Sequence, residues 1–146
     1  MNNLKSKKTS YIVLGIVDNA DAAKDFEDVY GSKCVGYAGC FVTGLDSEIN
    51  SFYDGSTDRF LQKFKEVIKK TPVNDEIKKR FYNDVSICSY CGRLILVIRC
   101  KFSGTLYKFR DTFYTRHLSS TEKVDLTSAE WFIMLQNKNG KMIGMM

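Results

Sequence analysis

The run RLILVIRC, residues 93–100, constrains the fold more strongly than any other part of the sequence. Its five central residues, 94–98, are all apolar, and three of them are β-branched. A strand with one face in water alternates apolar and polar residues, whereas an unbroken apolar run is typical of a strand buried on both faces. The chain is therefore expected to build a sheet around residues 93–100.

A second strand is predicted directly before this run. FYNDVSIC, residues 81–88, is separated from it by little more than SYCG, residues 89–92. Two strand-like runs joined by a very short link that contains glycine are typical of a β-hairpin. Gly92 is the expected turn residue.

Two cysteines at this turn have the spacing of half a zinc site. Cys88 and Cys91 are followed by Gly92 and a basic residue, as in zinc knuckles. Structural zinc needs a second pair of ligands, and the candidates Cys34 and Cys40 have five residues between them, which is unusual for such a site. A plain hairpin turn is thus predicted, with no metal or other cofactor, and Cys88 and Cys91 are kept as the alternative metal ligands.

Periodicity, capping residues and turn residues predict the other elements. In the first half they are a strand over 10–19 in which Gly15 permits a close approach, a helix over 18–32 capped by Asp18 or Asn19 and ended by Gly31, and a strand over 37–45. The second half adds a helix from Ser56 to Pro72, a short helix from Asn74, a hairpin over 105–118 that turns at Arg110 and Asp111, and a helix over 127–140. This order predicts an α+β fold, with a mixed, largely antiparallel sheet and helices packed against it.

Length and composition bound the class of protein. A chain of 146 residues suits one domain, which we place at residues 10–137, between a basic extension (1–9) and a C-terminal tail (138–146). The longest apolar run, residues 11–17, is too short to cross a bilayer, so no membrane partner is expected. Five cysteines without a disulfide framework favour a reducing compartment, and the cytoplasm is expected.

Charge is distributed unevenly along the chain. Residues 18–54 carry eight acids and two lysines, whereas residues 93–116 carry six bases and one acid. Residues 59–80 add eight bases against three acids. Such basic segments indicate a polyanionic partner, although lysines on a helix surface often serve only solubility.

The C-terminal half resembles the Schlafen AlbA-like domain family. The similarity begins at the buried strand and continues through a hairpin with the pattern Y-x-F/x-x-x-F-Y-x-R, a Ser-Ser-Thr turn and a closing helix. The residues that match this pattern are Tyr107, Phe113, Tyr114, Arg116, Ser119, Ser120 and Thr121. Upstream, Gly15, Val17, Asp18 and Gly44 match strand ends of the family. The resemblance covers roughly residues 10–135, and its most specific part is the C-terminal hairpin.

The family usually carries further residues before the first of these strands. A Glu-x-Lys element and an Asn-x-x-Gly-Gly run stand there in relatives, where this sequence has only KSKKTS, residues 5–10. Because carboxylates of that element are thought to help hold the nuclease metal, we expect no catalytic site of the chain's own. The alternative is a metal-dependent nuclease that uses Asp18, Asp46 and Glu48 and is completed by another segment or chain.

What the resemblance and the charge together predict is a nucleic-acid-binding domain, in transcription regulation or in defence against foreign genetic elements. The expected binding residues are Arg93, Arg99, Lys101, Lys108, Arg110, Tyr114, Arg116, Ser119, Ser120 and Thr121. Basic and hydroxyl groups would contact phosphates, and aromatic rings would stack on unpaired bases. Alternatively, Arg116 pairs with Asp111 or Glu122, or the hairpin edge binds a partner protein. The choice between DNA and RNA, and self-association, stay open.

Overall fold

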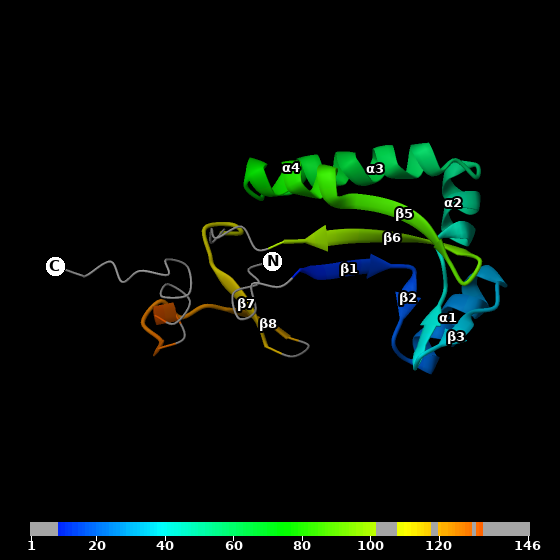
Figure 1. The fold of residues 1–146 in the computed structure, drawn as a ribbon, viewed down its shortest axis with the longest axis horizontal. Helices are drawn as coiled ribbons and strands as arrows, with labels where there is room; N and C mark the ends of the chain where they lie inside the picture. The colour runs from blue at the N-terminus through cyan, green and yellow to red at the C-terminus, as the bar shows by residue number, and fades with distance from the viewer. Residues whose placement is uncertain (1–8, 102–107, 118–119, 130, 133–146) are drawn as a thin grey trace. The chain divides into compact units, whose positions relative to one another are not determined.

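The computed structural model describes residues 9–101, 108–117, 120–129, 131 and 132 (Figure 1). Its contacts divide the chain into two compact units, which are described separately. The sheet unit comprises residues 11–70 and 81–99, and the hairpin unit comprises residues 1–10, 71–80 and 100–146. Helices and antiparallel strands together confirm the α+β class. The predicted extension (1–9) and tail (138–146) lie almost entirely outside the described residues, and the predicted domain boundaries stay predictions.

The strand predicted to be central lies in the middle of a three-stranded sheet. The order is β1 (Ser10–Leu14), β6 (Arg93–Cys100), β5 (Val85–Tyr90). The arrows of β1 and β6 run in opposite directions in Figure 1, and β5 pairs antiparallel with β6. Ile95, Leu96 and Ile98 are buried, so the prediction for this strand is confirmed.

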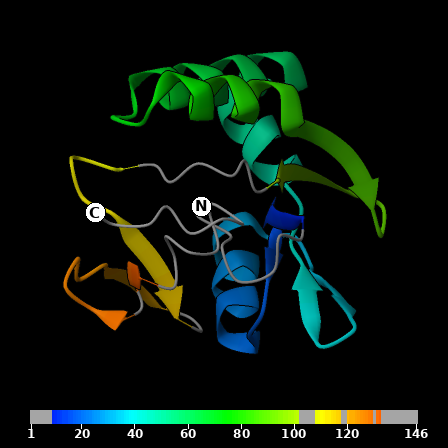
Figure 2. The same cartoon turned by 60° about the vertical axis from the view of Figure 1, so that its left-hand side comes forward.

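A second antiparallel sheet has the order β2 (Ile16–Val17), β4 (Cys40–Val42), β3 (Val35–Tyr37) and lies beside helix α1 (Ala20–Tyr30; Figures 1 and 2). The single strand predicted over 37–45 is wrong, because the chain reverses at Ala38 and Gly39, where φ is 50° and 80°. Nothing in the sequence marks Ala38 for this left-handed conformation. The strands therefore lie in separate sheets, where one sheet had been expected.

The two sheets meet at a set of hydrogen bonds that we call the sheet junction. The carbonyl oxygen of Gly15 accepts from the amides of Thr43 and Gly44, each at 3.0 Å, and the Leu45 amide donates to the Leu94 carbonyl at 2.8 Å. A Cβ atom on Gly15 would lie 3.3 Å from the Gly44 backbone. The predicted close approach at Gly15 is thus confirmed.

Helix α1 (Ala20–Tyr30) has the ends that the sequence predicts. Of the two candidate caps, Asn19 is the one used, since its side-chain oxygen accepts from the Ala22 amide at 2.7 Å. Gly31 is left-handed at the other end, with φ of 63°, and its amide donates to the Glu27 carbonyl at 2.8 Å.

Helix α2 (Asp46–Tyr53) was not predicted. Its N-cap, Leu45, has no side chain that can cap the helix, so the usual start signal is missing. The Asp46 carboxylate, which could act locally, instead accepts from the Leu94 amide at 2.9 Å. Asp46 and Glu48 therefore lie in the first turn of a helix, not in a loop after a strand.

Helices α3 (Thr57–Lys70) and α4 (Asp75–Asp84) follow. Ser56 caps α3 as predicted, and Asn74 caps α4 by accepting from the Glu76 amide at 2.8 Å. The strand predicted over 81–88 begins only at Val85, because α4 continues to Asp84. Of the helices in the described ranges, none combines the length and the apolarity needed to cross a lipid bilayer.

In the hairpin unit, β7 (Tyr114–His117) pairs antiparallel with β8 (Ser120–Lys123). The predicted turn at Arg110 and Asp111 is confirmed, because Phe109 and Thr112 exchange backbone hydrogen bonds of 2.9 and 3.1 Å. Ser120 and Thr121 lie in β8 and not in a turn, and Ser119 lies outside the described residues. Of the helix predicted over 127–140, the described part begins at Ala129.

The turn between β5 and β6 is the plain hairpin turn that the sequence predicts. Tyr90 pairs with Arg93, and the two residues between them, Cys91 and Gly92, have φ of 50° and 72°. Two positive φ values in a two-residue loop define a type I′ turn. Cys88 and Cys91 are free and exposed, and within the described ranges no three His, Cys, Asp or Glu side chains are grouped so that they could hold a metal.

Replacing Gly44 should destabilise the protein strongly. The added Cβ would lie 2.7 Å from the Asp46 Oδ2, which is held by the Leu94 amide, and 2.8 Å from the Arg93 Cβ. We expect Gly44→Ala to lower the free energy of unfolding by about 2–4 kcal/mol, from left-handed strain plus overlap. Gly31→Ala is the control, because φ is also positive but nothing lies within 4 Å, and it should cost only about 1 kcal/mol. Urea unfolding measures both, and equal losses would contradict the account.

Cys91→Asn distinguishes the turn from a metal site. Asparagine followed by glycine is the favoured pair in a type I′ turn, so the free energy of unfolding should stay within about 0.5 kcal/mol of the original or rise. Added zinc should leave the thermal midpoint of both proteins unchanged. A zinc-dependent rise that disappears in the variant would show that the thiols bind metal.

Candidate nucleic-acid interface

Arg93, the first of the predicted binding cations, is occupied within the sheet unit. Its guanidinium donates to the Ser32 hydroxyl at 2.9 Å and to the Lys33 carbonyl at 2.6 Å. The same loop is held by Glu27, whose carboxylate accepts from the Lys33 ammonium at 2.7 Å. This hydrogen bond, followed by one from the Cys34 amide, lowers the pKa of Glu27. Arg93 therefore ties β6 to the segment that follows α1.

Arg99 is also occupied. Its Nε and Nη2 donate to one carboxylate oxygen of Asp84 at 3.3 and 2.9 Å. The Asp84 side chain is only 20% exposed, so this pair is shielded more than a surface ion pair. Because both guanidinium groups have partners inside the sheet unit, we leave Arg93 and Arg99 out of the interface.

The hairpin unit presents its cations differently, at the turn that precedes β7. The Lys108 ammonium lies 5.4 Å from the centroid of the Phe113 ring, and the Arg110 guanidinium lies 5.4 Å from that of Phe109. Phe109 meets Tyr114 edge to face, with centroids 6.2 Å apart. Both basic side chains are exposed and the three rings are half-buried. We call residues 108–114, together with Trp131, the cation–aromatic turn.

Trp131 completes this group through a local set of hydrogen bonds. The Asp125 carboxylate accepts from the Thr127 amide and hydroxyl at 2.9 and 2.7 Å, which lowers its pKa. The Ser128 hydroxyl donates to the Asp125 carbonyl and accepts from the Trp131 amide. The Trp131 ring thereby lies 4.9 Å from Phe113, between centroids. The sequence predicts Trp131 only as part of an apolar helix and assigns it no role in binding.

The structure describes some of the other predicted binding residues. Lys101 and Thr121 are exposed, and the register of β7 and β8 sets Arg116 directly opposite Thr121, with Ser120 next along the strand. The backbone thus brings Arg116, Ser120 and Thr121 to one end of the hairpin. Ser119 and Tyr107 lie outside the described residues.

The three carboxylates of the nuclease alternative are not gathered into a metal site. Asp18 is exposed and accepts from the Asn19 amide group at 3.2 Å, Asp46 caps the Leu94 amide, and Glu48 lines a pocket. No group of three potential metal ligands occurs within the described ranges. The structure therefore gives the nuclease alternative no assembled cluster.

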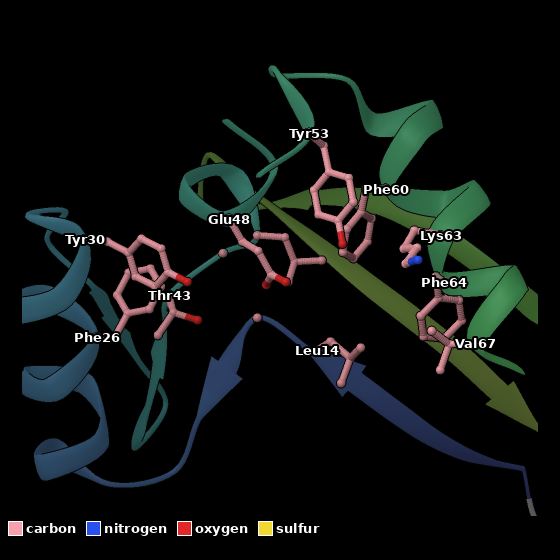
Figure 3. A pocket seen from close by; sticks show the side chains of 13 residues that line it. Leu14, Phe26, Tyr30, Thr43, Glu48, Tyr53, Phe60, Lys63, Phe64 and Val67 are labelled. Carbon is pink, nitrogen blue, oxygen red and sulfur yellow. The ribbon is translucent and has the colours of Figure 1, made fainter. Parts of the chain in front are cut away.

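A pocket in the sheet unit was not foreseen. It has a volume of about 440 Å³ and lies between α1, α2, α3 and the end of β1 (Figure 3). Aromatic side chains dominate its lining: Phe26, Tyr30, Tyr53, Phe60 and Phe64. The spacing of Phe26 and Tyr30 along α1 was the available signal, because residues four apart share a helix face.

The chain matches no known family model, no curated protein sequence and no solved structure. Membership of the Schlafen AlbA-like family therefore stays a prediction. The candidate interface therefore rests on the contacts within the hairpin unit alone.

Proposed function

We propose that the chain binds single-stranded nucleic acid through the hairpin unit, and that the cation–aromatic turn is the contact surface. The observation that carries this proposal is the placement of Lys108 and Arg110 over aromatic rings at an exposed turn. Proteins that bind single strands combine cations that follow the backbone with rings on which bases stack. Both groups occur here within a few residues.

The balance of groups favours unpaired strands over a duplex. Half-buried rings at a turn are accessible to a base that has left its stack, whereas bases in a duplex have no free face. Lys101 and the end of the β7–β8 hairpin add donors for phosphate. All five cysteines are free thiols, which supports a reducing compartment such as the cytoplasm as the setting. A role in gene regulation or in defence is compatible with this activity.

Affinity should fall with salt in proportion to the number of phosphate contacts. Of the predicted binding residues, four bases belong to the hairpin unit: Lys101, Lys108, Arg110 and Arg116. At about 0.7 counterions per contact on single strands and about 0.9 on duplex DNA, the slope of log affinity against log salt should be about −2.8 and about −3.6 respectively. Fluorescence anisotropy with labelled oligonucleotides measures it. No binding at low salt would end the proposal.

The double variant Lys108→Ala/Arg110→Ala tests the turn itself. Loss of two phosphate contacts should flatten the salt slope on single strands by about 1.4 and weaken binding of all sequences about equally. Lys65→Ala/Lys69→Ala is the matched control, because it removes the same charge from exposed positions of α3 in the sheet unit. The control should bind almost normally. If both variants lose affinity alike, net charge and not the turn governs binding.

A further inference from the structure

The pocket of the sheet unit has two aromatic walls. Phe26 and Tyr30 of α1 lie together, with ring centroids 4.9 Å apart and planes tilted by 39°. On the other side, the Tyr53 and Phe60 rings meet edge to face at 5.5 Å, and Phe64 follows along α3 (Figure 3). Walls of this kind suit a flat, aromatic ligand, because rings prefer stacked and edge-to-face contacts. A volume of about 440 Å³ lies in the usual range for small-molecule sites, about 300–1,000 Å³.

Glu48 supplies the acceptor in this pocket. It projects from the first turn of α2 and lies between the two groups of rings (Figure 3). The residue is half-buried, and in the described part of the chain no hydrogen bond or ion pair reaches its carboxylate. An ionised carboxylate only accepts hydrogen bonds, so a ligand that satisfies it must present donors.

Lys63 supplies the opposite charge at the rim. Its side chain is 57% exposed, and its ammonium lies 3.7 Å from the Glu66 carboxylate, which is a long distance for an ion pair. A cation at the rim disfavours a positively charged ligand and favours an anionic group such as phosphate. The pocket therefore suits a molecule that has hydrogen-bond donors on a flat ring and a negative charge at its other end.

Guanine nucleotides combine these features. The Watson–Crick edge of guanine carries two adjacent donors, N1–H and the N2 amino group, which can both reach one carboxylate. Adenine and cytosine set their amino donor beside a ring-nitrogen acceptor, which a carboxylate repels, and uracil has one N–H between two carbonyls. Unpaired bases are commonly read at this edge while they stack on aromatic side chains.

We propose that the pocket binds guanine as an unpaired base or free nucleotide, with Glu48 accepting from N1–H and N2–H and Lys63 contacting phosphate. This inference rests on the proposed function, because it names the base that a nucleic-acid-binding chain would select. It uses none of the residues of the cation–aromatic turn, so the two can fail separately.

Isothermal titration of the full chain with single nucleotides tests the pocket. GMP should bind about 10- to 100-fold more tightly than AMP, CMP or UMP, the usual discrimination of a bidentate contact. IMP, which lacks the N2 amino group, should fall between them. Glu48→Gln should remove the preference for GMP, whereas Asp25→Asn, an exposed acid of α1 outside the pocket, should leave it intact. Lys63→Gln should weaken GMP several-fold and leave guanosine unchanged.

Each remaining outcome decides the question. Equal binding of the four nucleotides, no binding of any, or competition by tetramethylammonium ion would overturn the guanine pocket, the last in favour of a cation cage. If Glu48→Gln fails to fold by circular dichroism, the ranking of GMP, IMP and AMP on the unaltered chain decides alone. Oligonucleotide binding without a guanine preference would overturn this inference and leave the proposed function standing. GMP binding without oligonucleotide binding would overturn the proposed function and leave the guanine pocket standing.

Discussion

The sheet unit depends on one backbone acceptor, the carbonyl of Gly15. Two successive amides, Thr43 and Gly44, donate to it at 3.0 Å, which fixes the end of β4 against the bend between β1 and β2. Gly15 and Gly44 both have positive φ, 98° and 74°; a Cβ atom on Gly15 would press on the Gly44 backbone, and one on Gly44 would overlap the side chains of Asp46 and Arg93. The next two residues bind the central strand: the Leu45 amide donates to the Leu94 carbonyl, and the Asp46 carboxylate accepts from the Leu94 amide. The sheet junction therefore also aligns β6.

The sheet junction also shapes the pocket. Gly15, Thr43, Gly44 and Leu45 line it, so the segment that joins the sheets forms one of its walls. Because α2 begins directly after the sheet junction, Glu48 is carried to a position that the packing of the sheets determines. Because these hydrogen bonds fix the backbone that carries Glu48, a ligand would have to order only its side chain, which lowers the entropic cost of binding.

Sequence reasoning succeeded where the signal was local. The apolar run of β6, the Asn19 and Ser56 caps, and the turns at Gly92 and Arg110 are each decided by a few adjacent residues. It failed where a hydrogen-bond partner lies far away in the sequence. The start of α2 is anchored by the amide of Leu94, 48 residues away, and the Arg93 guanidinium donates to the Ser32 hydroxyl, 61 residues away. The pocket was missed for the same reason, since its rings come from three helices whose packing no periodicity reveals.

The two units differ in what holds their aromatic side chains, and this bears on what those side chains can do. In the described ranges, every buried apolar side chain belongs to the sheet unit. The rings of the cation–aromatic turn are half-buried and contact one another and two cations instead. Cation–ring contacts at exposed sites contribute only about 0.5–1 kcal/mol each. A base that stacks on the turn competes with contacts of that size, whereas a ligand of the pocket fills space between rings that the sheet unit already fixes.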